Sequence, residues 1–216
     1  MNKNKKLKLG ITGFSLLMMS NVIFAENLFA KEENHHQSKT NLSITEGEFI
    51  LQTSGLESFG QITLTTDRQT VKTNFNMPIF KVIDARGTQE GWRVIVHSTI
   101  FKEVTYEGFI GEPTILPIGS LALEMPKKIE QVGNVHNSKY PILSKGVQIL
   151  DNGAIVVITT ANKGEGMGEF DITFNKSSLQ LTIDAATARI DKVNYPDSLT
   201  PYASTITWDL ISGLFF

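Results

Sequence analysis

Residues 168–184, GEFDITFNKSSLQLTID, carry the pattern that decides the fold. Apolar and polar residues alternate over 170–174 and again over 179–183, with a polar turn at 175–178 between them. Successive side chains of a strand face opposite ways, so each run has one apolar and one polar face. This stretch therefore predicts two short strands, each with one buried face and one solvated face.

The same period of two recurs before this stretch, for example at Ile62 and Leu64. Turn-forming residues separate such runs, as at 151–153 and 196–197, and no long amphipathic helix is indicated after residue 47. We therefore predict an all-β fold, an antiparallel β-sandwich of short strands with long surface loops. The pattern breaks over Met125–Gly146, where we expect one or two long surface loops, used either for binding or as a tolerated insertion.

The N-terminus predicts export. Residues 1–25 begin with four lysines and no acid, continue with a short apolar run and end at Ala25, as in a secretory signal peptide. Ala30 is an alternative cleavage position. Residues 26–46 form a predicted flexible polar lead-in, and 47–216 are the predicted folded domain.

Charge and composition exclude several classes of binding partner. Removal of residues 1–25 takes four lysines from a chain of net charge -2, so the mature chain carries -6. This acidic balance speaks against nucleic acid, which binds clustered Lys and Arg. With no cysteine, a thiolate metal site and a lipid-modified cysteine are excluded. We expect neither a sorting signal nor membrane insertion of the mature chain, so attachment to a cell would be non-covalent.

The two tryptophans stand in related motifs. The first is FKVIDARGTQEGWRV at 80–94, the second is YASTITWDL at 202–210, and ANKGEGMGEF at 161–170 lies between them. These segments resemble the WxL family of Gram-positive surface proteins. Residues 80–94 resemble its Asp-x-Arg-Gly and Gly-Trp-x-aliphatic segments, and residues 161–170 its glycine-spaced approach to a late strand. Residues 202–210 resemble its Tyr-x-x-x-aliphatic-Thr-Trp-x-Leu close. The resemblance extends from about Gly47 to the end, with the departures that Val94 replaces the first Leu and Leu214 replaces a late proline.

The resemblance implies a secreted protein on the surface of a Gram-positive bacterium, bound non-covalently to peptidoglycan. The alternative it implies is a subunit of a surface complex held by a membrane-anchored companion, with a further adhesin role toward host matrix. The motif residues then become candidate binding residues, with a role in the core as the alternative: Asp84, Arg86, Gly91, Trp92, Val94, Tyr202, Trp208 and Leu210.

Two interpretations of the motifs follow from the residues themselves. On a strand, Trp92 shares a face with Val94, and Trp208 shares a face with Leu210, so both tryptophans are either core anchors or exposed stacking platforms. Asp84 and Arg86 flank the glycine turn, and form either an ion pair within the turn or a grip on the free carboxylates of peptidoglycan stems.

No chemistry beyond binding is indicated. Glu103, Glu107 and Glu112 show no pairing of the kind that glycan cleavage needs, and His97 and His136 are isolated from any nucleophile motif. His35 and His36 have no third ligand nearby, so no metal site is predicted. The glycines at 164, 166 and 168 lack the lysine of a phosphate-binding loop and predict a turn or bulge before Phe170. We expect a protein that is not an enzyme and uses no cofactor.

Overall fold

A computed structural model describes residues 42–213 except 57, 75 and 134–138. The chain divides between Ser43 and Ile44 into two units, of which the second carries every strand described here. The predicted signal peptide, most of the lead-in, the three histidines 35, 36 and 136, and Leu214 lie outside the described residues. These predictions stay predictions.

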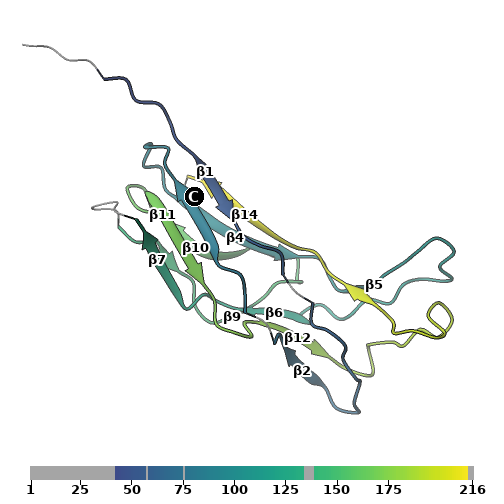
Figure 1. Ribbon diagram of the computed structural model, residues 1–216. Coiled ribbons are helices and arrows are strands. Elements are labelled where there is room, and N and C mark those ends of the chain that lie inside the picture. The colour runs from purple at the N-terminus through teal and green to yellow at the C-terminus, as the bar shows by residue number, and fades with distance from the viewer. Residues whose placement is uncertain (1–41, 57, 75, 134–138, 214–216) are drawn as a thin grey trace, which may run out of the picture. The chain divides into compact units, whose positions relative to one another are not determined.

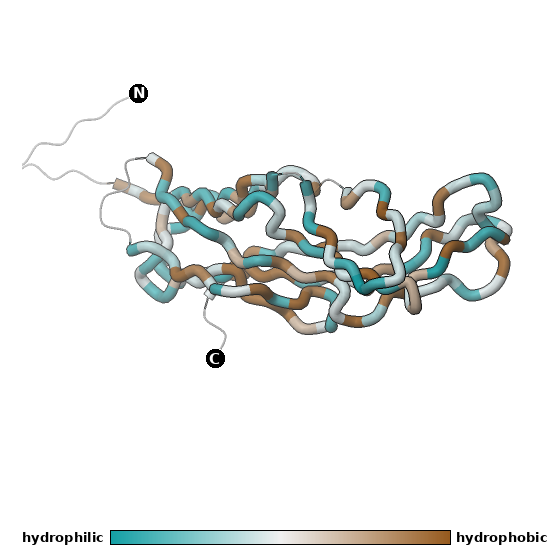
Figure 2. Tube along the Cα trace, turned by 90° about the horizontal axis from the view of Figure 1, so that it is seen from below, coloured by the Kyte–Doolittle hydropathy of each residue, from teal (hydrophilic) through white to brown (hydrophobic). Residues whose placement is uncertain are grey.

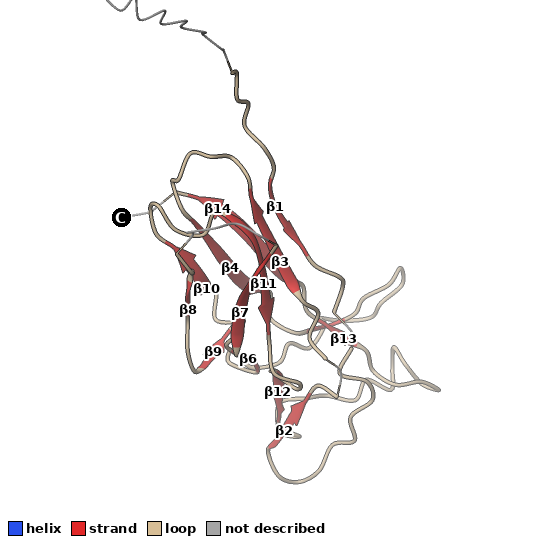
Figure 3. Cartoon of the chain, turned by 60° about the vertical axis from the view of Figure 1, so that its left-hand side comes forward, coloured by secondary structure: helices blue, strands red, loops and turns tan. Residues whose placement is uncertain are grey.

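The described residues form fourteen strands and no helix, so the prediction of an all-β fold is confirmed (Figure 3). Within this part of the chain no helix is long and apolar enough to cross a membrane. The strands are β1 (Phe49–Gln52), β2 (Gln69–Lys72), β3 (Phe80–Asp84), β4 (Trp92–Ser98), β5 (Lys102–Glu103), β6 (Leu121–Glu124), β7 (Lys128–Val132), β8 (Ile142–Leu143), β9 (Val147–Ile149), β10 (Val156–Ala161), β11 (Gly168–Thr173), β12 (Leu179–Ile183), β13 (Tyr202–Ala203) and β14 (Ile206–Ser212).

The strands pair in antiparallel fashion in four sheets (Figure 1). The first sheet has the order β1-β3-β11-β7, the second β14-β4-β10-β8 and the third β2-β12-β6-β9, while β13 and β5 form a two-stranded ribbon. The first and second sheets face each other, since Phe170 of β11 packs against Trp92 of β4 with ring centroids 6.2 Å apart. This arrangement is the predicted antiparallel sandwich.

Residues 168–184 explain why the chain builds layers. The two predicted strands are β11 and β12, and the polar turn lies between them, yet the two strands belong to different sheets. The turn at 175–178 therefore carries the chain from the first sheet to the third. The apolar faces of both strands contribute to the core, with Phe170, Ile172 and Leu179 all buried.

The core is one large cluster between the sheets and a smaller one near β13. The large cluster draws buried side chains from all three four-stranded sheets, and the smaller one is built on Leu116, Leu181 and Ile183. Figure 2 shows hydrophobic and hydrophilic residues interspersed along the chain. A sheet with one face against such a core keeps its alternating pattern.

Two sequence predictions are corrected. Residues 61–65 are not a strand, although Ile62 and Leu64 face the smaller core as their alternation required. Among the described residues, no strand pairs with this segment. Met125–Gly146 does not consist of loops alone, because it contains β7 and β8. Both are edge strands. β7 is mostly polar and β8 is only two residues long, so neither shows the alternation that predicts a strand.

Candidate functional site

Trp92 lies wholly within the core at the start of β4. Its indole Nε1 donates a hydrogen bond of 2.8 Å to the carbonyl oxygen of Gly166, which satisfies its one polar atom. Its ring meets Phe170 of the facing sheet. Trp92 has no exposed surface with which to form a stacking platform, and the structure places it as a core anchor.

Glycines make this packing possible. A Cβ on Gly166 would lie 2.4 Å from the Cβ of Ala161 and 2.6 Å from the indole nitrogen of Trp92. A Cβ on Gly91 would lie 2.3 Å from the carbonyl oxygen of Ala161, and both glycines have positive φ. Residues 163–164 form a turn, as predicted, and the glycine at 166 also lets the backbone approach Trp92.

The second motif completes the same core from the neighbouring strand. In the pairing of β14 with β4, Trp208 lies opposite Val96 and Leu210 lies opposite Val94, so all four side chains share the inward face. Trp208 is half-buried, and its ring lies 4.3 Å from that of Phe80 across the sandwich. The tryptophan-bearing parts of the two motifs therefore lie on two adjacent strands of one sheet, β4 and β14.

Asp84 and Arg86 form a saturated ion pair at the end of β3. The guanidinium donates two parallel hydrogen bonds of 2.9 Å to the two carboxylate oxygens of Asp84. Its remaining donors bond the hydroxyl of Ser212 and the carbonyl oxygen of Gly91, and Glu90 lies at 3.5 Å.

The surroundings of Arg86 are closed as well as saturated. The side chains of Arg86 and Asp84 are 6% and 3% exposed, and the guanidinium carbon lies 3.6 Å from the centroid of the Phe49 ring. The hydrogen bonds to Asp84 raise the pKa of Arg86 above its ordinary value, so the group is always charged. A ligand carboxylate would have to displace an internal partner to reach it. We call these residues the motif cluster: Asp84, Arg86, Gly91, Trp92, Val94, Trp208 and Leu210.

Tyr202, the remaining motif residue, lies elsewhere. It belongs to β13, packs against the smaller core, and its hydroxyl donates to the carbonyl oxygen of Arg189 at 2.9 Å and accepts from the amide of Arg189 at 3.1 Å. Burial raises the pKa of Tyr202, so the hydroxyl keeps its proton for this bond. Tyr202 thus fixes the backbone of an exposed arginine.

Arg189 begins one of two loops, residues 104–114 and 189–201, that lie side by side beyond β5 (Figure 1). We call them the paired loops. Asn194 joins them: its side-chain oxygen accepts from the amide of Ile110 at 2.8 Å, and its Nδ2 donates to the carbonyl oxygen of Ile110 at 3.0 Å. Its backbone carbonyl accepts from the hydroxyl of Tyr106 at 2.9 Å.

Asp191 holds Asn194 in place. One carboxylate oxygen accepts from the amides of Val193 and Asn194 at 2.9 and 3.0 Å, and the other accepts from Nδ2 of Asn194 at 2.7 Å. The bond from the Asn194 side chain is the largest cause that lowers the pKa of Asp191 from 3.8 to about 2. The turn that joins the loops therefore depends on an ionised carboxylate.

An aromatic group stands on the paired loops. The rings of Tyr106, Phe109 and Tyr195 contact one another with centroids 5.8 to 6.4 Å apart, and Tyr106 is 50% exposed. Arg189 and Lys192 on the same loop are exposed cations. The sequence analysis missed this surface because its residues fall outside any periodic pattern. The available signal was a cluster of aromatic residues in polar, turn-rich segments.

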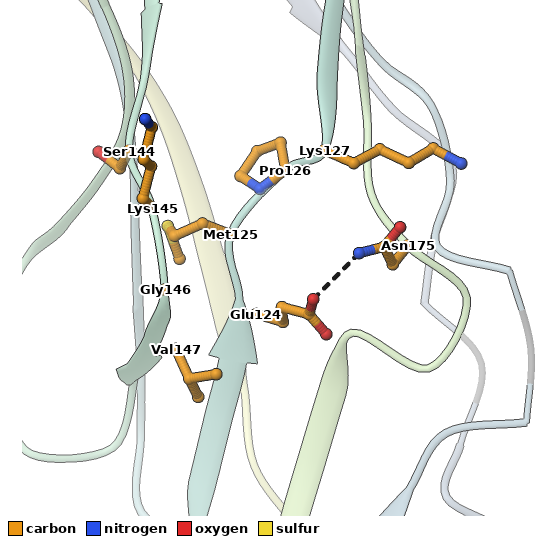
Figure 4. Close-up of a pocket in the computed structure, with 9 residues that line it drawn as sticks. All are labelled: Glu124, Met125, Pro126, Lys127, Ser144, Lys145, Gly146, Val147 and Asn175. Carbon is orange, nitrogen blue, oxygen red and sulfur yellow. Dashed lines mark hydrogen bonds between the residues drawn. The ribbon is translucent and has the colours of Figure 1, made fainter.

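The remaining candidates show no catalytic arrangement. Glu103 is buried in β5 and accepts a hydrogen bond of 3.0 Å from the amide of Thr114, while Glu107 and Glu112 are exposed. In the described part of the chain no three His, Cys, Asp or Glu side chains gather as metal ligands. A pocket beside the end of β6 is lined by Glu124, Lys127 and Lys145 (Figure 4). The carboxylate of Glu124 accepts a hydrogen bond of 3.0 Å from Nδ2 of Asn175.

These features define a β-sandwich whose buried motif residues pack in its interior and whose paired loops carry exposed aromatic and cationic side chains. The family model described as WxL domain surface cell wall-binding matches residues 5–213. The chain belongs to the WxL family of surface cell wall-binding domains. Comparisons with curated proteins and with solved structures found no match.

Proposed function

We propose that this protein is exported, remains on the surface of a Gram-positive cell and binds peptidoglycan non-covalently. The family match over nearly the whole chain carries the proposal, because it describes a surface cell wall-binding domain. The predicted signal peptide supports export. The absence of a basic surface bias supports a ligand recognised by shape, stacking and hydrogen bonds.

We further propose that the paired loops are the surface that meets the wall. Exposed aromatic rings stack on sugar rings, and exposed guanidinium and ammonium groups pair with carboxylates such as those of peptidoglycan stems. Tyr106, Arg189 and Lys192 offer both kinds of group on neighbouring loops. In contrast, Trp92, Asp84 and the side chain of Arg86 are buried, and their polar groups are already paired.

This assignment gives the family motif a positioning role at the contact surface. Tyr202 bonds both backbone groups of Arg189, so a motif residue sets where an exposed cation stands. The other motif residues stabilise the sandwich from which the paired loops extend. The motif then matters for wall binding without touching the wall.

The test is retention of the full chain on purified peptidoglycan stripped of protein and wall polymers. We expect the wild type to be retained and Tyr106→Ala to bind about two- to tenfold more weakly, because one stacking ring is lost. Thermal melts of both proteins show whether the fold is preserved.

Two matched variants make the result specific. Tyr140→Ala removes an equally exposed tyrosine, 55% exposed against 50%, from outside the paired loops, and should bind as the wild type does. Tyr106→Phe keeps the ring and should also bind. Wild-type protein that washes through the column would refute peptidoglycan binding. Retained wild type with equally retained Tyr106→Ala would refute only the assignment to the paired loops.

A further inference from the structure

The second and third sheets separate beside β8, and the separation leaves a groove. β8 pairs with β10 at Leu143–Thr159 and Ile142–Thr160, after which the chain leaves the second sheet and continues as β9 beside β6. The outer edge of β9 and the edge of residues 154–157 have no strand beside them among the described residues. Unpaired strand edges of this kind accept an added strand.

This strand-edge groove is open, and both polar and apolar surface line it. It has a volume of about 500 Å³ and runs between residues 147–149 and 152–157. Val147, Ile149 and Ile155 are 53%, 43% and 64% exposed, which leaves large apolar side chains without cover. The exposed Lys145 precedes β9 and lines the adjoining pocket with Lys127 (Figure 4).

The chain also carries a strand-like sequence pattern outside any sheet. Residues 42–46, the N-terminal arm, have no ladder partner among the described residues, and the chain is first tethered where the amide of Gly47 bonds the carbonyl oxygen of Ala85. Leu42 and Ile44 are 84% and 85% exposed and alternate with Ser43 and Thr45. This is the pattern of a half-buried strand.

We propose that the N-terminal arm of one copy adds as an antiparallel strand to β9 in the strand-edge groove of a second copy. One register matches every pair: Leu42 opposite Ile149, Ile44 opposite Val147, and Glu46 opposite Lys145. Residues directly opposite each other in an antiparallel pair share a face, so the register joins apolar to apolar and acid to base. A shift of one residue would break all three pairs.

The arm of the same chain cannot fill its own groove. The arm leaves β1, which lies against β14, whereas the groove lies beyond β10 at the other side of the second sheet. Two strand spacings, about 10 Å, separate β14 from β10. The groove also lies farther along the strands, at the level of Val156, which pairs with Val96 of β4. Val96 is four residues from the start of β4, near which the arm leaves the sheet, so this adds a distance of about 13 Å. Three residues from Gly47 to Ile44 span at most about 10 Å.

The contact is heterologous, since the arm and the groove are different surfaces of one molecule. Heterologous contacts that do not close on themselves build open chains. Copies bound to the wall lie close together on one surface, so their effective concentration is high. A short added strand is then enough for one copy to associate with the next. The expected assembly is a head-to-tail row of copies.

Disulfide trapping tests the register, because the full chain contains no cysteine of its own. We expect oxidised Ile44→Cys/Val147→Cys to form dimers and higher species on non-reducing gels, in amounts that rise with protein concentration. The matched control Ile44→Cys/Gln148→Cys places the second thiol on the opposite face of β9 and should trap at most a small fraction. Equal trapping by both variants, trapping within one chain, or a monomer at every concentration would overturn the proposal.

Charge reversal tests the same register without cysteine. Glu46→Lys and Lys145→Glu should each weaken association in sedimentation velocity about two- to fivefold, the range of a cross-strand charge pair. The double variant Glu46→Lys/Lys145→Glu should regain wild-type association. Additive weakening in the double variant would show that the two residues do not meet. Peptidoglycan retention should stay unchanged in all three variants, which separates this contact from wall binding.

Discussion

The motif cluster and the paired loops are each stabilised by a hydrogen-bonded carboxylate, but the first is closed to solvent and the second is exposed. In each, a carboxylate that accepts several hydrogen bonds fixes a turn: Asp84 accepts from Arg86, and Asp191 accepts from Asn194. In the motif cluster the result is closed, with Trp92 buried. In the paired loops the result is open, with Tyr106 half exposed.

This contrast shows where a strong sequence signal comes from. The tryptophan motifs stand out because a large ring, its glycine contacts and its strand partners constrain many positions at once. An exposed surface such as the paired loops constrains few positions, since solvent accepts many side chains. The most recognisable residues of this family member therefore mark what stabilises the fold, and the proposed contact surface lies on less recognisable loops.

The largest effect is expected from Trp92→Ala. The substitution removes a fully buried indole and leaves a cavity, so we expect the free energy of unfolding to fall by about 3–5 kcal/mol. Chemical denaturation followed by circular dichroism measures it. The half-buried Trp208, changed to Ala in the same way, should cost less because part of its surface is already solvated.

Trp92→Ala also tests the comparison itself. At temperatures where the variant remains folded, its retention on peptidoglycan should equal that of the wild type, because the indole touches no ligand. A stable variant that no longer binds would show that the motif cluster, and not only the paired loops, contributes to the contact surface.

An intermediate effect is expected from Gly166→Ala. The added methyl would lie 2.4 Å from Ala161 and 2.6 Å from the indole of Trp92, at a φ of 72°. Overpacking of this kind costs about 1–3 kcal/mol. Thermal melts should show the loss, and Gly164→Ala is the control, because its φ is also positive but its added methyl meets nothing. Equal losses would mean that backbone strain, and not contact with Trp92, requires the glycine.

The sequence predicts a strand correctly where the alternating apolar residues also pack against the core. β11 and β12 follow from residues 168–184, since each has one face against the core. Residues 61–65 alternate equally well but form no strand, because alternation reports which face is buried and not whether a neighbour completes the ladder. β7 went unpredicted for the converse reason: its partner β11 supplies the ladder while its own sequence is mostly polar.

The candidate site was predicted only in part. Spacing on a strand and a turn placed Trp92 and Val94 on one face, but it left open whether Trp92 is a core anchor and whether Arg86 pairs with Asp84 or with a ligand. The structure shows Trp92 buried and Arg86 paired with Asp84. The paired loops do not follow from spacing, because Asp191 and Ile110 are joined through Asn194 across more than 80 residues of chain. Contacts between distant loops leave no periodic trace in a sequence.

The smallest effect is the pH dependence of stability that Asp191 contributes. The pKa of Asp191 is lowered in the folded protein from 3.8 to about 2, so its ionised form stabilises the fold. This stabilisation is complete above about pH 4 and is lost as the pH falls toward 2. Denaturation of the wild type between pH 5 and 2 should therefore show a steeper loss of stability than denaturation of Asp191→Asn, which has no such group to protonate.

The same variant connects stability to binding. Asp191→Asn keeps the shape of the side chain but weakens the bonds that hold Asn194, so at neutral pH the paired loops should loosen while the sandwich stays folded. Hydrogen exchange should then speed up at the amides of Val193 and Ile110 and remain slow in β4. If exchange in β4 rises equally, the paired loops unfold with the sandwich, and the motif cluster and the loops are one cooperative structure and not two.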